Sequence, residues 1–145
     1  MHLTREVLLP VSCAEAWELL SEPDELARWL GAPRPFALRP GATTTLTEPD
    51  GTSKTLVFDD VRVGEHIGFT WWSDVDGPST ASHVELVVEA ATGGSLVTVT
   101  ETAAPSASPR ASVAGGVRRL PIGAGWDARL VDLELRALLR QAVTA

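Results

Sequence analysis

The order of two kinds of apolar pattern constrains the fold of this chain more than any other feature. Residues 12–30 and 121–143 carry apolar side chains at the three- and four-residue spacing of amphipathic helices. Between them, turn signals recur at short intervals and separate segments rich in β-branched and aromatic residues. Because strands joined by short loops pair antiparallel, this order predicts an α+β fold in which a curved, antiparallel, six-stranded sheet wraps around a long C-terminal helix.

Two short helices are predicted directly after a first strand over residues 3–9. Ser12, followed three residues later by Glu15, is the pattern of a capping box, in which each side chain accepts a backbone hydrogen bond from the other residue. Ser21 and Asp24 repeat that pattern, and Gly31 suits a left-handed helix stop. The apolar stripe of the first helix is predicted to consist of Cys13, Ala16, Trp17 and Leu20. The stripe of the last helix is predicted to consist of Trp126, Leu130, Leu133 and Ala137, widened by Leu138.

Side chains in a strand alternate between the two faces of the sheet, so every second residue shares a face. The inward-facing sets of the last three strands are predicted to be Ile67, Phe69 and Trp71, then Val84, Leu86 and Val88, then Val97, Val99 and Glu101. Glu101 is the odd member, because a carboxylate in register with valines needs a hydrogen-bond partner, contact with water or a proton. The alternative interpretation is that Glu101 lies at the strand end and is exposed.

The net charge of −7 argues against nucleic acid or an anionic membrane as the main partner, because both are bound chiefly through basic patches. The start of the chain is charged, and no apolar run reaches the length of a membrane span. We therefore expect one cytoplasmic domain over residues 1–145, as a monomer or a homodimer. Basic residues near the C-terminal end could meet an acidic protein partner, and the alternative is a solvated helix face and loop. The residues are Arg118, Arg119, Arg129 and Arg136.

Histidine and cysteine, which carry much enzyme chemistry, are scattered along the chain. His2, His66 and His83 show no ligand spacing, so neither a metal nor a cofactor is expected. His66 and His83 are predicted to point away from the apolar faces of their strands. Cys13 is the only cysteine, which excludes a disulfide within the chain, and it lies on a buried helix stripe where it should act as a small hydrophobe.

The remaining candidates for acid, base or nucleophile give an equally weak signal. Lys54 is the only lysine and lies beside a turn, so a buried Schiff-base lysine is not expected. Asp59 and Asp60 are adjacent, so they are predicted to face opposite sides of their strand and not to act as a paired acid and base.

Five segments of the chain, in order, resemble the signatures of START-like (SRPBCC, helix-grip, Bet v-type) domains. They are residues 11–20 (VSCAEAWELL), 27–30 (ARWL), 67–71 (IGFTW), 96–101 (LVTVTE) and 125–127 (GWD). Within that superfamily they are most similar to bacterial relatives of the activator of the heat-shock-protein-90 ATPase. The resemblance implies a hydrophobic cavity between the sheet and the C-terminal helix. By position, it places six residues in this pocket: Trp71, Glu101, Trp126, Leu130, Phe69 and Phe58.

Residues 102–125 depart from that resemblance. Relatives commonly carry a shorter, charge-rich and more helical connection, whereas this segment is rich in Ala, Ser and Pro. Its length is unusual for a plain connection within a compact domain, so it is predicted to be either a functional loop beside the cavity or a mobile one.

Three functions are compatible with the resemblance, because the superfamily hosts several. The first is non-catalytic binding of a small hydrophobic ligand, lipid-like or polyketide-like, in the cavity. The second is a co-chaperone-like protein-interaction module. The third is an enzyme of the cyclase or hydratase type, with Glu101 as general acid or base. The predicted topology and the set of Trp71, Glu101 and Trp126 favour the first.

Overall fold

The computed structural model describes residues 2–48, 50–103 and 125–144 of the chain. The strands are β1 (His2–Leu9), β2 (Thr43–Thr47), β3 (Ser53–Arg62), β4 (His66–Ser73), β5 (Ser82–Ala91) and β6 (Gly94–Ala103). The α-helices are α1 (Cys13–Ser21), α2 (Pro23–Leu30) and α4 (Trp126–Thr144), and a 3-10 turn, η1, spans Pro78–Thr80. The predicted 102–125 segment lies largely outside the described residues, as do Arg118 and Arg119.

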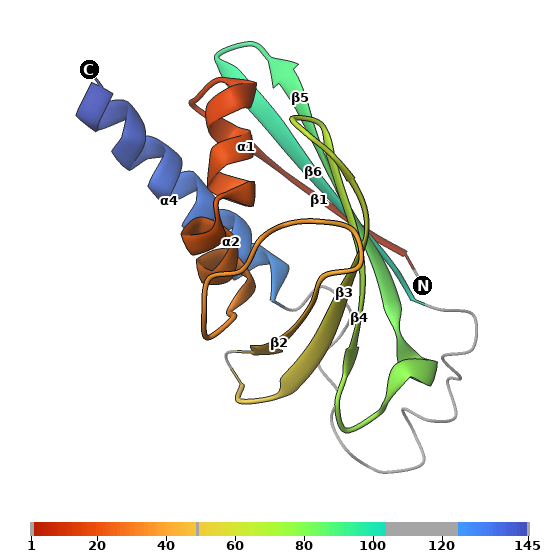
Figure 1. Cartoon of the computed structure of the whole chain (residues 1–145). Helices are drawn as coiled ribbons and strands as arrows, with labels where there is room; N and C mark the ends of the chain where they lie inside the picture. The colour runs from red at the N-terminus through yellow and green to blue at the C-terminus, as the bar shows by residue number, and fades with distance from the viewer. Residues whose placement is uncertain (1, 49, 104–124, 145) are drawn as a thin grey trace.

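The six strands form one antiparallel sheet in the order β1-β6-β5-β4-β3-β2. The first strand therefore pairs with the last, while the other neighbours follow one another along the chain. In Figure 1, α1, α2 and α4 all lie on one side of the sheet, and the sheet bends toward them. The predicted α+β helix-grip fold, with its six strands and long C-terminal helix, is confirmed.

Local sequence signals explain where the short helices begin and end. Ser12 caps α1, and its hydroxyl accepts a hydrogen bond from the Glu15 amide at 3.2 Å, as the capping box predicts. Gly31 ends α2 with a φ of 89°, the left-handed conformation that glycine adopts without strain. The second predicted cap is wrong, because Glu22 is the N-cap residue of α2 and Ser21 instead donates to the Trp17 carbonyl within α1.

The apolar core lies between the sheet and the helices. The inward-facing sets predicted for β4, β5 and β6 are all buried, as are Trp126, Leu130, Leu133 and Ala137 of α4. Three predicted stripe members are not fully buried, and the first of them, Cys13, is partly buried against the core. Trp17 is only partly buried, because Leu19 occupies the core position in its place, and Leu138 is 47% exposed on the outer side of α4. None of the described helices is long and apolar enough to cross a membrane.

The arginines of α4 do not form the solvated surface that the sequence predicts. Arg129 and Arg136 are each only 8% exposed, because they form ion pairs with acidic residues of the same chain. Arg129 contacts Glu48, while Arg136 contacts Glu25 of α2 and Asp132. These two side chains are therefore occupied within the fold and are not free to bind an acidic partner.

Candidate functional site

The candidate site centres on Glu101, a carboxylate inside the apolar core near the end of β6. Its side chain faces inward, because it continues the alternation of Val97 and Val99, and it is 3% exposed. Trp71 of β4 donates its indole N–H to Glu101 Oε2 at 2.8 Å, and Trp126 of α4 donates to Oε1 at 2.9 Å. The exposed interpretation of Glu101 is therefore wrong, since both carboxylate oxygens have buried partners.

Aromatic rings surround this carboxylate on the sheet side. The centroids of Trp71 and Trp126 are 5.5 Å apart, Phe69 lies 5.2 Å from Trp71, and Phe58 lies 5.8 Å from Phe69. Such separations are typical of aromatic pairs that attract one another. Leu130 lies one turn beyond Trp126 on α4, in the same core cluster. The six residues assigned to a pocket are therefore neighbours in one buried cluster, and whether they contact a ligand stays a prediction.

Lys54 joins this cluster, although the sequence interpretation placed it at the surface beside a turn. Its Nζ lies 3.9 Å from the centroid of the Trp71 ring, a cation–π contact. Burial lowers the pKa of Lys54 below its usual value, while the nearby Glu48 and Glu101 carboxylates oppose that shift. The strand alternation contained the missing signal, because Lys54 shares the inward face of β3 with Leu56 and Phe58.

A buried ion pair completes the polar side of the site. Arg129 Nη2 lies 2.7 Å from Glu48 Oε1, and both side chains are 8% exposed. The same guanidinium donates to the carbonyl oxygens of Trp29 and Leu30, each at 3.0 Å, and so satisfies the C-terminal end of α2. Gly125 lies so close that an added Cβ would be 2.5 Å from Arg129 Nη1 and 2.9 Å from Glu48 Oε2, so a larger residue would displace the ion pair where α4 begins.

A groove of about 300 Å³ runs along this ion pair, between the end of α2, the end of β2 and the start of α4. Trp29, Glu48, Gly125 and Arg129 are among its lining residues, whereas the six residues of the predicted pocket are not. A second hollow of about 500 Å³ lies between α1 and α4, lined largely by charged side chains. The groove therefore adjoins the site at its polar edge, beside the Arg129–Glu48 ion pair. It is not lined by Trp71, Glu101 or Trp126.

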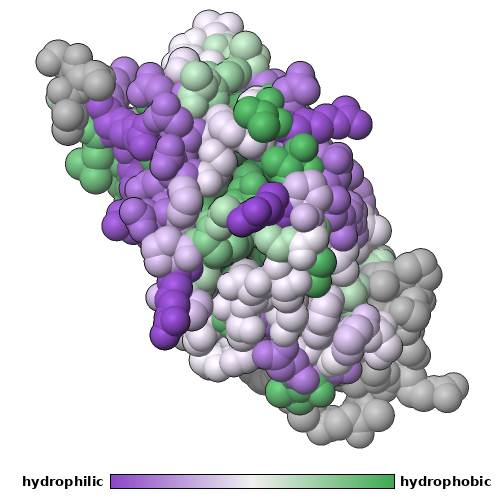
Figure 2. Space-filling model, in the orientation of Figure 1, coloured by the Kyte–Doolittle hydropathy of each residue, from purple (hydrophilic) through white to green (hydrophobic). Residues whose placement is uncertain are grey.

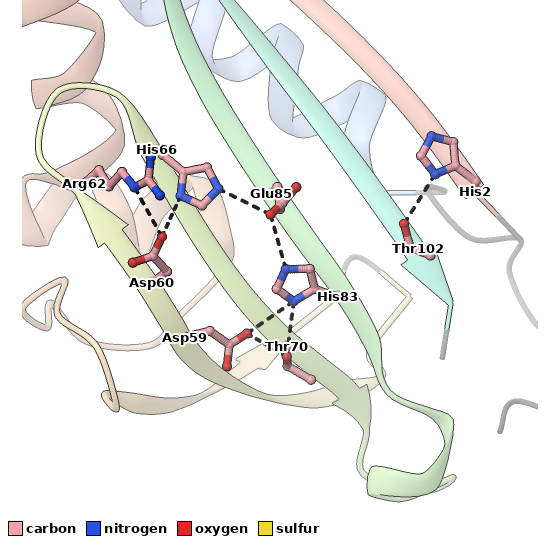
Figure 3. A network of polar contacts seen from close by, with 9 residues as sticks. All are labelled: His2, Asp59, Asp60, Arg62, His66, Thr70, His83, Glu85 and Thr102. Atoms are coloured by element: carbon pink, nitrogen blue, oxygen red, sulfur yellow. Dashed lines mark hydrogen bonds and ion pairs between the residues drawn. The ribbon is translucent and has the colours of Figure 1, made fainter. Parts of the chain in front are cut away.

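A second polar cluster lies on the opposite, outer face of the sheet (Figure 3). His66 Nδ1 lies 3.3 Å from Asp60, His83 Nδ1 lies 3.3 Å from Asp59, and both rings approach Glu85. The histidines therefore point away from the apolar face, as predicted. Within the residues that the structure describes, no set of three ligating side chains is arranged to hold a metal ion.

The prediction that Asp59 and Asp60 face opposite sides of β3 is wrong. The pairing of β3 with β4 shifts register between Phe58 and Asp60, so Asp59 is an extra residue in a β-bulge. As a result both carboxylates join the outer cluster, where Thr70 donates to Asp59 at 2.7 Å (Figure 3). A β-bulge shifts the alternation of side chains between the two faces by one residue, and the sequence prediction assumed an unbroken alternation.

The outer side of α4 carries an exposed apolar stripe. Val131, Leu135, Leu138 and Leu139 are between 47% and 65% exposed, and they lie at the spacing of one helix face. Figure 2 shows apolar side chains at the outer edge of this helix, next to a broad hydrophilic area. An apolar stripe of this kind on a surface helix is a feature of interaction surfaces.

Comparison with solved structures finds the same fold in proteins of low sequence identity. DynU16, from the dynemicin biosynthetic locus, is 23% identical with a TM-score of 0.68; the match covers 94% of this chain but only 46% of DynU16. Protein MLL2253 of Mesorhizobium loti is 16% identical with a TM-score of 0.68, over 97% of this chain and 98% of that protein. The Aha1 dimer of Colwellia psychrerythraea is 12% identical with a TM-score of 0.65, over 92% and 93% of the two chains.

No curated protein matches the sequence significantly. The family described as Activator of Hsp90 ATPase homolog 1-like protein does match it, over residues 10–134. That range contains both short helices, β2 to β6, and Glu101, Trp126 and Leu130 of the candidate site. Together with the helix-grip fold, this match shows that the chain belongs to the Activator of Hsp90 ATPase homolog 1-like protein family.

Proposed function

We propose that the protein binds a small, largely apolar ligand, without transforming it, where Trp71, Glu101 and Trp126 meet between the sheet and α4. The observation that carries this proposal is the buried Glu101 carboxylate, whose hydrogen-bond donors are two neutral indoles. Burying a carboxylate costs more free energy than burying a leucine of similar size. A carboxylate that stays buried despite this cost is expected to have a function that uses its charge or its hydrogen bonds.

Orienting a ligand is a task that the geometry of Glu101 allows. An ionised carboxylate has about four lone-pair positions, and the two indole N–H groups occupy only two of them. A hydroxyl or amine of a ligand could take one of the others, while the faces of Trp71 and Phe69 contact its apolar part. Small-molecule sites combine an apolar lining with a few convergent polar groups in this manner.

The size of the adjacent groove supports a small ligand. The volume of the groove, about 300 Å³, is at the lower limit of the range for ligand pockets. The groove reaches the cluster through Arg129, whose guanidinium carbon lies 5.2 Å from the Trp71 ring centroid. A ligand that extended from the groove to Glu101 would need side-chain rearrangement in the aromatic cluster, because the described rings already contact one another.

Native mass spectrometry of the gently purified protein, followed by organic extraction, is the first test. A reproducible mass excess that disappears on extraction would support the proposal and reveal the class of ligand. The extracted compound is then returned to the protein and tryptophan fluorescence is recorded. The variant Glu101→Gln should weaken binding, whereas Glu89→Gln, at an exposed position on β5, should not. Equal affinities of the two variants would contradict the role of Glu101.

A second candidate function, a protein-interaction module, is favoured by the exposed apolar stripe on α4 and by the family match. Arg129 and Arg136 cannot supply this interaction, since both are already paired with acidic residues of the same chain. The test is the ATPase rate of purified Hsp90 with and without the protein. Stimulation that is lost in Leu135→Ser but kept in Val75→Ser, a loop position that is 89% exposed, would support the module. Absence of stimulation by the wild-type protein would remove this candidate.

A further inference from the structure

The Arg129–Glu48 ion pair uses only part of its hydrogen-bonding capacity. A guanidinium has five N–H groups, and the contacts of Arg129 to two backbone carbonyls and to Glu48 involve only Nε and Nη2. Among the described residues, no oxygen accepts a hydrogen bond from Nη1. Glu48 is contacted on Oε1, and no described residue donates to Oε2. The ion pair therefore keeps one donor atom, Nη1, and one acceptor atom, Oε2, for a further partner.

These two atoms converge on the space beside Gly125. A Cβ at Gly125 would lie 2.5 Å from Arg129 Nη1 and 2.9 Å from Glu48 Oε2, so both atoms face the place that a side chain would fill. The backbone does not call for glycine here, because Gly125 is not one of the glycines with a positive φ. The three residues all line the groove of about 300 Å³. The lack of a side chain at Gly125 therefore leaves a donor and an acceptor within reach of that groove.

The charges along the groove are balanced in sign. Its lining contains two arginines, Arg28 and Arg129, and two carboxylates, Glu48 and Asp132. An anion that bound at Nη1 would also approach Glu48, and a cation that bound at Oε2 would also approach Arg129. Either ion would therefore meet a like charge at the point where it gains a hydrogen bond. A neutral group that accepts at one atom and donates at another suits both partners.

We propose that the groove binds the carboxamide group of a small neutral molecule, at a subsite separate from the Trp71–Glu101–Trp126 cluster. The amide oxygen accepts a hydrogen bond from Arg129 Nη1, and the amide N–H donates one to Glu48 Oε2. Each bond has a charged partner, which makes it stronger than a bond between two neutral groups. This inference goes beyond the proposed function, because it does not require a ligand to enter the aromatic cluster.

Titration of the full-length, isotope-labelled protein with benzamide, followed by NMR, tests the subsite. The backbone amide signals of Gly31 and Gly125, both on the groove lining, should shift, and the Arg129 Nε–H signal should shift with them. The indole N–H signal of Trp71, which reports on the aromatic cluster, should stay in place. Benzoate and benzylamine should bind about ten-fold more weakly than benzamide, because each loses one hydrogen bond and meets one like charge.

Two leucine variants of α4 provide a matched comparison. Ala128→Leu narrows the groove from an exposed position on its lining and leaves the ion pair and Gly125 unchanged. Ala142→Leu makes the same substitution at an exposed position further along the helix, away from the groove lining. We expect Ala128→Leu to weaken benzamide binding about ten-fold, because the larger side chain occupies part of the groove, and Ala142→Leu to leave the affinity unchanged.

Absence of shifts at Gly31 and Gly125 would overturn the proposal, because water alone would then satisfy the ion pair. Benzoate or benzylamine binding as tightly as benzamide would overturn it too, since the subsite would not select a neutral group. An equal effect of the two leucine variants would place the binding outside the groove. Shifts confined to the Trp71 indole would reject this subsite and support the ligand site at the aromatic cluster, so failure of one site is distinguished from failure of the other.

Discussion

Replacing Arg129 by methionine removes the cation from the buried ion pair at the edge of the site. Methionine has a similar length, so the change mainly deletes the charge and its donors. Glu48 would then be an unpaired carboxylate at a position that is 8% exposed, and the carbonyls of Trp29 and Leu30 would lose their donors. All three losses affect the same junction, between the end of α2, the β2–β3 turn and the start of α4.

The expected cost follows from these losses. Removing one partner of a buried ion pair typically costs about 3–5 kcal/mol. The two carbonyls add less than their full desolvation penalty, because water in the adjacent groove of about 300 Å³ can reach them. We therefore expect Arg129→Met to lower the free energy of unfolding by about 4 kcal/mol. For a domain of this size that corresponds to a fall in Tm of about 10–15 °C.

Urea unfolding, followed by far-UV circular dichroism, measures this cost. Arg5→Met is the matched control, because it breaks the exposed Arg5–Asp127 pair, whose side chains are 46% and 78% exposed. Such surface pairs contribute about 0–1 kcal/mol. The double variant Glu48→Leu/Arg129→Met should recover much of the loss, since an apolar pair can replace a buried ionic one. A cost below about 1 kcal/mol for Arg129→Met, or no recovery in the double variant, would refute the reasoning.

Three further predictions concern other parts of the fold. Glu101→Gln should destabilise the protein by about 1–3 kcal/mol in the same assay, because an amide cannot accept from both indoles at once. Gly94→Ala should cost about 3 kcal/mol, since its Cβ would overlap the Leu9 carbonyl, whereas Gly64→Ala, which meets open space at a φ of +82°, should cost about 1 kcal/mol. Burial lowers the pKa of Lys54, so the unfolded state binds more protons. Stability should therefore rise with pH as it approaches the usual lysine pKa of about 10.4, and Lys54→Met should flatten that rise.

The sequence predicts the fold well because each element carries its own local signal. The capping box at Ser12, the stop at Gly31 and the alternation ending at Glu101 all reappear in the structure. These signals act over a few residues and need no knowledge of distant partners. The pairing of β1 with β6 has no such local signal, since it joins residues about a hundred positions apart, and the sequence predicted no strand order.

The site is less predictable because its polar contacts join distant segments. Alternation alone placed Trp71 and Glu101 on the inward face, and the structure confirms that they are buried and in contact. Arg129 and Glu48 were missed because 81 positions separate them and nothing in either segment indicates the other. Lys54 could have been found, because it alternates with the buried Leu56, but its turn neighbours suggested exposure.

Three of the buried polar residues, Glu48, Glu101 and Arg129, lie at one end of the core, where α4 begins. Further along β6 and α4, most buried positions are apolar, as at Val97 and Leu133, and Ser95 and Arg136 are the exceptions. Near the end of β6 and the start of α4, the fold instead buries Glu101, and Lys54 lies against the Trp71 ring with no ion pair to any of the described carboxylates. Replacing buried ionic groups by apolar residues of similar size is often neutral or stabilising, because burial removes charges from water. Stability alone is therefore a weak reason for burying Glu101 at this end of the core, which agrees with the ligand-orienting role proposed for it.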